Sequence, residues 1–238
     1  MKELIEKIRK KGYWNVEIRP TVFEEKRIPD LDSCIALIKE CQVSLRGWSY
    51  PHIDNTGISV GGNDSVQSFC DWPEGGYFEY WRLYQSAQFV HYFTMREDYR
   101  LSEKKIQEIK HYHSTSSAKF LDIISTLYSV TEVLEFTKRM AINNVFNASV
   151  EIKIELGDVQ GRELFFWDSF SRYLSRSYVC SFPDENIIAS RTIERNDLLA
   201  NSSKLAIDVC LEIFRKFNWS TNAQIFEEDQ RKFLERRS

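Results

Sequence analysis

The chain has 238 residues, of which 42% are hydrophobic and 28% are charged, and its formal net charge is -3 at pH 7. This composition is that of a globular protein long enough to bury a core. It lacks the basic excess of a dedicated nucleic-acid-binding protein, and no segment reaches the roughly 18 apolar residues of a membrane span. The five cysteines form no C-x-x-C pair, and the start MKELIEKIRKKG has no apolar run typical of a signal peptide. We therefore expect reduced thiols, a cytoplasmic location and no membrane segment.

The first elements follow clear periodicities. Residues 1–11 carry Leu4, Ile5 and Ile8 on one face, which predicts a short helix that ends at Gly12. Residues 13–19 alternate apolar and polar side chains and predict a strand that ends at Pro20. An apolar helical stripe over residues 31–45 predicts a second helix.

Residues 46–76 show no periodic pattern of apolar side chains. They hold six of the nine glycines and two of the five prolines of the chain. This content predicts a long loop with short strand pieces at most. Structureless loops longer than roughly 12–15 residues are uncommon in compact domains, and they are often functional when present.

A hairpin follows this loop. Residues 77–84 and 88–96 are aromatic on both faces, and a turn at Gln85-Ser86-Ala87 can join them. We expect two central strands that are covered on both sides. Residues 102–112 are mostly polar and predict a surface helix.

The second half opens with a long amphipathic stretch from Ser116 to about Asn143, which predicts a helix. Residues 150–156 then alternate strictly and predict a half-exposed strand, with Leu164 to Trp167 returning beside it. We expect its apolar side chains to face a core made with the preceding helix. Further strands are expected at 177–182 and 187–193, a long helix from about 196, and a short helix within 221–235.

This order of elements predicts an α+β fold, with mostly antiparallel sheet flanked by long amphipathic helices. We expect two closely packed lobes. Residues 1–115 would form an aromatic-rich lobe that contains the glycine-rich loop, and residues 116–238 would form a helix–strands–helix lobe.

The loop offers the first candidate site. Arg46, Trp48, Tyr50 and His52 lie within seven residues and are bracketed by glycine and proline. Aromatic faces beside polar groups suit a pocket for a small molecule or a stacked base. The alternative is a loop that two buried aromatics hold in place, with His52 bonded to the backbone.

The hairpin offers the second candidate, a polar set of Glu79, Arg82, His91 and Arg96. Charges amid so much aromatic surface need partners, so a pairing of Glu79 with an arginine or with His91 is expected on structural grounds alone. We also expect Glu79, Arg82 and His91 to lie near Trp48 and His52.

These stretches carry a resemblance. The pattern Arg-Gly-Trp-x-x-Pro-His-Ile runs from Arg46 to Ile53, and Tyr-Trp-Arg-x-Tyr-Gln-Ser runs from Tyr80 to Ser86. Both resemble stretches of a family of uncharacterised bacterial proteins over about residues 13–98. The resemblance brings no known activity. It implies a bacterial origin and an association with defence or mobile-element genes.

Two weaker patterns concern metals. Glu151-Ile152-Lys153 has the E-x-K spacing of metal-dependent nucleases, although alternating charge on a solvated strand explains it equally. His111 and His113 are two residues apart, in a charged segment where solvated side chains are expected. We predict no metal site and no cofactor.

The sequence thus favours a non-enzymatic binding or assembly component of a bacterial multi-protein system, with another protein as partner and a small-molecule or nucleic-acid ligand. One alternative is a metal-dependent nuclease or other phosphodiester-acting enzyme that uses Glu151 and Lys153. The other is a nucleotide or nucleic-acid sensor that uses residues 46–91.

Overall fold

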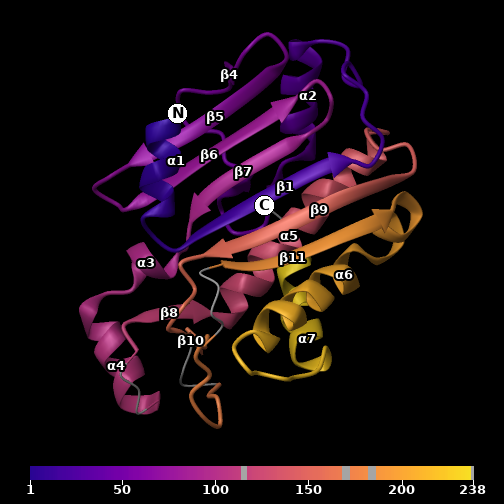
Figure 1. The fold of residues 1–238 in the computed structure, drawn as a ribbon. Coiled ribbons are helices and arrows are strands. Elements are labelled where there is room, and N and C mark those ends of the chain that lie inside the picture. Colours follow the sequence, from indigo (N-terminus) through magenta and orange to yellow (C-terminus); the bar gives the residue numbers. More distant parts are fainter. Residues whose placement is uncertain (114–116, 168–171, 182–185, 237–238) are drawn as a thin grey trace.

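The computed structural model describes residues 1–113, 117–167, 172–181 and 186–236. Its centre is a seven-stranded antiparallel sheet in the order β11-β9-β1-β7-β6-β5-β4. Helices occupy both of its faces (Figure 1), and the expected α+β class is confirmed. The strands of this sheet are β1 (Tyr13–Pro20), β4 (Ser59–Val60), β5 (Ser65–Trp72), β6 (Tyr77–Tyr84), β7 (Phe89–Thr94), β9 (Ser149–Gly157) and β11 (Asn186–Glu194).

Two small ribbons and the helices complete the described fold. The short strands β2 (Val43–Ser44) and β3 (Ser49–Tyr50) pair with each other, and β8 (Lys119–Asp122) pairs in parallel with β10 (Arg162–Phe165). The helices are α1 (Lys2–Arg9), α2 (Leu31–Cys41), α3 (Glu97–Arg100), α4 (Glu103–His113), α5 (Ile123–Ile142), α6 (Arg195–Arg215) and α7 (Gln224–Leu234). No helix in this described part has both the length and the apolar composition to cross a bilayer.

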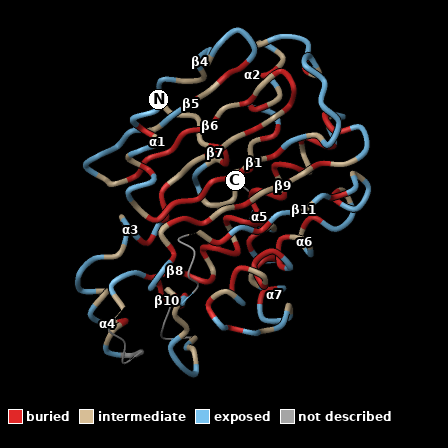
Figure 2. Tube along the Cα trace, viewed as in Figure 1, coloured by how far each residue is buried: buried red, intermediate tan, exposed pale blue. Residues whose placement is uncertain are grey.

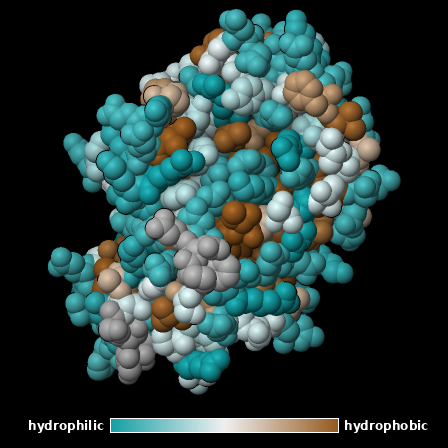
Figure 3. Space-filling model, viewed as in Figure 1, coloured by the Kyte–Doolittle hydropathy of each residue, from teal (hydrophilic) through white to brown (hydrophobic). Residues whose placement is uncertain are grey.

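The main core lies between one face of the sheet and the helical layer of α2, α5, α6 and α7 (Figures 1 and 2). Alternation puts Val16 of β1 and Ile152 and Ile154 of β9 on this face, where they are buried with Leu127 and Leu134 of α5. The expected burial of the alternating strand against the long helix is confirmed. The opposite face is covered in part by α1 and is otherwise mostly polar, with a few exposed hydrophobic side chains (Figure 3).

Both halves of the chain contribute strands to the central sheet. Strand β1 pairs with β7 on one side and with β9 on the other, so strands from residues 1–115 and 116–238 form one sheet. The expected boundary between two lobes therefore does not divide the structure, because strands from both sides of it share one sheet and one core. Residues 114–116, where the boundary was expected, lie outside the described residues.

Four local expectations are corrected. Residues 65–72 are the full strand β5 rather than loop, and residues 119–122 are strand β8 rather than the start of the long helix. Strand β10 pairs with β8 and does not return beside β9. The described part of 177–182 makes only an isolated bridge, from Val179 to Glu163.

Candidate functional site

A cavity of about 710 Å³ opens between the helix-covered face of the sheet and the first half of α5. It lies where segments distant in sequence converge: the β2–β3 ribbon, strands β6 and β7, helix α3 and the start of α5. Pockets that hold drug-sized ligands usually measure about 300–1,000 Å³, so this one has the size for a small organic molecule.

A buried glutamate forms part of the cavity floor. Glu79 is 2% exposed, and its Oε1 lies 2.8 Å from Nε2 of His91 and accepts the backbone N–H of His52 at 3.0 Å. The Tyr77 hydroxyl donates to Oε2 of the same carboxylate. Burial, and then the charge of Glu79, raises the pKa of Tyr77 well above its usual value. The carboxylate is thus held by three partners, as a buried charge requires.

The ring of His91 has one further polar atom. Its Nδ1 is buried without a hydrogen-bond partner among the described residues, and so is the hydroxyl of Tyr50. The two rings are neighbours, with centroids 5.0 Å apart, and both residues line the cavity. In the neutral tautomer that donates from Nε2 to Glu79, Nδ1 is a hydrogen-bond acceptor.

A buried ion pair forms one wall. Two guanidinium nitrogens of Arg46 donate to the carboxylate of Glu132 in α5, and one of them lies 3.1 Å from Oε1. The guanidinium also donates to the Ser129 hydroxyl at 3.2 Å. Glu132 is 2% exposed, and its burial raises its pKa against the opposing effect of Arg46. This geometry ties the β2–β3 ribbon to α5 and occupies the guanidinium of Arg46.

Glu97 is a second buried acid in the wall. Its Oε1 accepts the backbone N–H of Asp122 at 3.0 Å, and Asp122 in turn caps α5 by accepting from Ser125 N at 2.9 Å. Burial, and then the charge of Asp122, raises the pKa of Glu97 to about 7. A carboxyl group with that pKa carries a proton for part of the time at neutral pH and can donate a hydrogen bond.

Three further arginines line the cavity without an ion pair in the described structure. Their guanidiniums lie over aromatic rings: Arg96 is 4.9 Å from the ring centroid of Trp167, Arg100 is 5.6 Å from Tyr99, and Arg236 is 5.5 Å from Tyr128. Cation–π contacts of this kind hold a guanidinium plane in place and leave its N–H groups available.

Two exposed tryptophans complete the lining. Trp48 and Trp72 are 47% and 46% exposed. Trp48 stacks on His52 with ring centroids 3.9 Å apart and meets Tyr77 edge to face. The Trp72 ring lies against Gly75, where an added Cβ would fall 2.3 Å from it, so the glycine makes room for the ring.

Most of the residues singled out from the sequence come together here. Arg46, Trp48, Tyr50, Glu79 and His91 all line the cavity. His52 lies beside them, because it stacks on Trp48 and shares an oxygen of Glu79 with His91.

Arg82 is the exception, and the expectation that it shares this site is wrong. It lies three positions after Glu79 on β6, and alternation therefore points it to the other face of the sheet. There it donates to Gln67 Oε1 at 2.7 Å and lies over the rings of Tyr80 and Tyr84.

Several residues that line the cavity could not be recognised as site residues from the sequence. Glu97 and Arg100 belong to a charged stretch that reads as surface, and Glu132 and Ser129 belong to the polar side of α5. Arg236 lies at the far end of the chain, beyond α7. Of the three cavity arginines that lie over aromatic rings, only Arg96 belongs to the polar set predicted on the hairpin, a set that also contains Arg82.

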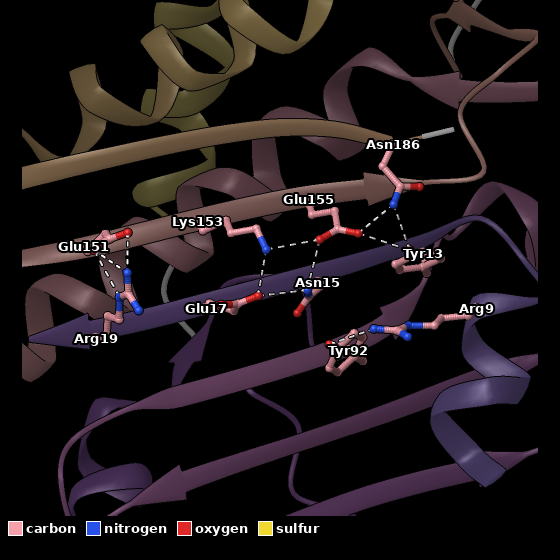
Figure 4. Close-up of polar contacts among 10 residues, drawn as sticks. All are labelled: Arg9, Tyr13, Asn15, Glu17, Arg19, Tyr92, Glu151, Lys153, Glu155 and Asn186. Carbon is pink, nitrogen blue, oxygen red and sulfur yellow. Dashed lines mark hydrogen bonds and ion pairs between the residues drawn. The ribbon is translucent and has the colours of Figure 1, made fainter. Parts of the chain in front are cut away.

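The E-x-K pattern lies on the opposite, polar face of the sheet (Figure 4). Arg19 of β1 donates to both carboxylate oxygens of Glu151, at 3.0 and 2.9 Å. Lys153 bonds Glu17 at 2.9 Å and lies 3.4 Å from Glu155. Both residues are thus occupied by cross-strand ion pairs. No group of three potential metal ligands comes together within the described residues, which do not include the side chain of His113.

Comparisons with protein-family models, with curated proteins and with solved structures found no match to this chain.

Proposed function

We propose that the protein is a non-enzymatic binding protein and that its cavity holds a small organic anion. The observation that carries this proposal is an imbalance of charge. The guanidiniums of Arg96, Arg100 and Arg236 form no ion pair within the described residues. The carboxylates of Glu79 and Glu132 are already bonded, and Asp122, whose pKa burial raises and the charge of Arg96 lowers, accepts two backbone N–H groups.

The acids of the cavity do little to offset these cations. Glu79 is bonded to His91, and Glu132 is bonded to Arg46. Glu97 has a pKa of about 7 because of its burial, so at neutral pH it carries its negative charge only part of the time. An anion that enters meets available N–H donors and displaces no protein partner.

A binding role also agrees with the floor of the cavity. The carboxylate of Glu79 holds His91, Tyr77 and the backbone of His52 together, which supports a structural function for this cluster. The nuclease alternative receives no support from Glu151 and Lys153, because Arg19 and Glu17 already hold them on the other face of the sheet. Membership of a bacterial multi-protein system, with a protein partner, stays part of the proposal and rests on the sequence resemblance alone.

The test is a thermal-denaturation screen with small anions: dicarboxylates, sugar phosphates, nucleotides and inorganic phosphate. A ligand at 100 times its Kd stabilises the folded state by about 2.7 kcal/mol, which raises the Tm of a chain of this length by roughly 5–11 °C. We expect at least one class to do so in the wild-type protein. Arg96→Gln should abolish the shift. The matched control is Arg231→Gln, since Arg231 is an exposed arginine of α7 that pairs with Glu235 and does not line the cavity.

Two results would contradict the proposal. One is the absence of a shift with every anion in the wild-type protein. The other is a shift that survives in Arg96→Gln as fully as in Arg231→Gln, which would place the anion elsewhere.

A further inference from the structure

The cavity is lined by two groups of side chains that differ in chemistry. One gathers around the first turns of α5 and is cationic, and the other gathers around Tyr77 and is aromatic. Each is connected by contacts between its own members, so the chemistry of a ligand that fits both can be deduced.

The cationic group is built on the start of α5. Asp122 caps the helix and also accepts the backbone N–H of Trp167 at 3.0 Å, and Arg96 lies over the ring of that tryptophan. Arg236 lies over Tyr128, which follows Ser125 by one turn of α5. Two guanidiniums thus flank the first turns of the helix. Planar guanidiniums with free N–H groups match the oxygens of a phosphate.

The aromatic group begins next to the cationic one. Tyr99 lies in α3, the one-turn helix that Arg96 precedes, and its ring is 5.4 Å from that of Tyr77. Tyr77 in turn meets Trp48 at 5.6 Å, and Trp48 leaves nearly half of its surface uncovered. Trp72 adds a second exposed ring to the lining. Uncovered ring faces of this kind are platforms on which a flat heterocycle stacks.

We infer that the ligand is a free nucleoside phosphate, whose phosphate lies between Arg96 and Arg236 and whose base stacks on the aromatic group that contains Trp48. This inference rests on the proposed function and specifies its ligand. A cavity of about 710 Å³ is large for inorganic phosphate alone, but it suits a molecule of nucleotide size. A simple sugar phosphate or dicarboxylate would leave the tryptophan faces unused.

The experiment is isothermal titration calorimetry at pH 7 with matched fragments. The ligands are the four ribonucleoside 5′-monophosphates, their nucleosides, ribose 5-phosphate, inorganic phosphate and a 5′-phosphorylated hexanucleotide. We expect at least one mononucleotide to bind ten times more tightly than its nucleoside or ribose 5-phosphate. Trp48→Ala should weaken that binding about tenfold, the effect of losing one stacking ring, and Trp48→Phe should restore most of it. Circular dichroism would verify that both variants are folded.

Each outcome has a separate meaning. Equal affinity for ribose 5-phosphate and the nucleotide would overturn the base assignment while the proposed anion site stands. Tighter binding of the hexanucleotide than of any mononucleotide would overturn the assignment to a free nucleotide. If no anion bound the wild-type protein, both the inference and the proposed function would fail.

Discussion

Glu97 shows how one buried side chain sets the pH response of the cavity. It is 5% exposed, its Oε1 accepts the backbone N–H of Asp122, and the charges of Asp122 and Arg162 act on its pKa in opposite directions. Burial dominates, so the pKa is raised to about 7. An acid whose folded pKa lies above its unfolded pKa binds protons more tightly in the folded state. The contribution of Glu97 to the free energy of unfolding therefore falls as pH rises from about 4.5 to about 7, and changes no further above that.

Glu97→Gln should remove this dependence, because the amide keeps the hydrogen bond from Asp122 N but does not ionise. The variant should gain stability relative to the wild-type protein between pH 5 and pH 8, by on the order of 3 kcal/mol for a shift of about 2.5 pKa units. Urea denaturation at the two pH values measures the gain. Parallel pH profiles for the two proteins would show that Glu97 does not titrate in this range.

Arg46 and Glu132 belong to the cavity for a structural reason. Arg46→Ala would leave the carboxylate of Glu132 buried without its partner, and loss of one member of a buried pair costs about 3–5 kcal/mol. The double variant with Arg46→Met and Glu132→Leu should recover most of that loss, since no charge is then stranded. Chemical denaturation of the three proteins tests this expectation. Normal stability of Arg46→Ala, combined with loss of anion binding, would instead make Arg46 a ligand contact.

At the scale of the elements, hydrophobic alternation predicts the strands that have one apolar face. It does not predict strands that form because of their partners in the sheet. Within strand β9, residues 150–156 alternate strictly between apolar and charged side chains. Strand β5 turns Ser68 inward, where it bonds Gly57 O, so a polar residue interrupts its apolar side. Strand β8 holds Phe120 and Leu121 at positions that also suit the stripe of the following helix. The parallel pairing of β8 with β10 and the N-cap at Asp122 fix where the helix begins.

The central position of β9 leads to a prediction of stability. Ile152 is 3% exposed and packs in the core with α5, so Ile152→Ala should lower the free energy of unfolding by about 2–5 kcal/mol. Glu151→Gln, at the adjacent position on the polar face, should cost at most about 1 kcal/mol, since its ion pair with Arg19 is partly exposed. Urea titrations compare the two. An unchanged midpoint for Ile152→Ala would mean that this register of the strand is wrong.

At the scale of the whole molecule, the α+β class could be predicted from the order of the elements, but the single sheet could not. Hydrophobic alternation shows which face of a strand is buried, and it does not show which strand lies beside it. The pairing of β1 with β9 joins residues more than a hundred positions apart. The same long-range assembly brings Arg96, Glu97 and Arg236 to a cavity whose floor comes from the hairpin. Only the hairpin and loop residues, which cluster in sequence, could be anticipated.

The six tryptophans of the chain provide the most direct test that this cavity is the binding site. Trp14, Trp48, Trp72 and Trp167 line the cavity, whereas Trp219 packs against Phe214 and Phe226 and does not. The measurement is a ¹H–¹⁵N spectrum of the indole N–H groups, recorded while a mixture of the four ribonucleoside 5′-monophosphates is added. We predict saturable shifts for Trp48, Trp72 and Trp167 and an unmoved signal for Trp219. A spectrum in which these three signals stay fixed, or in which Trp219 alone moves, would contradict binding in this cavity.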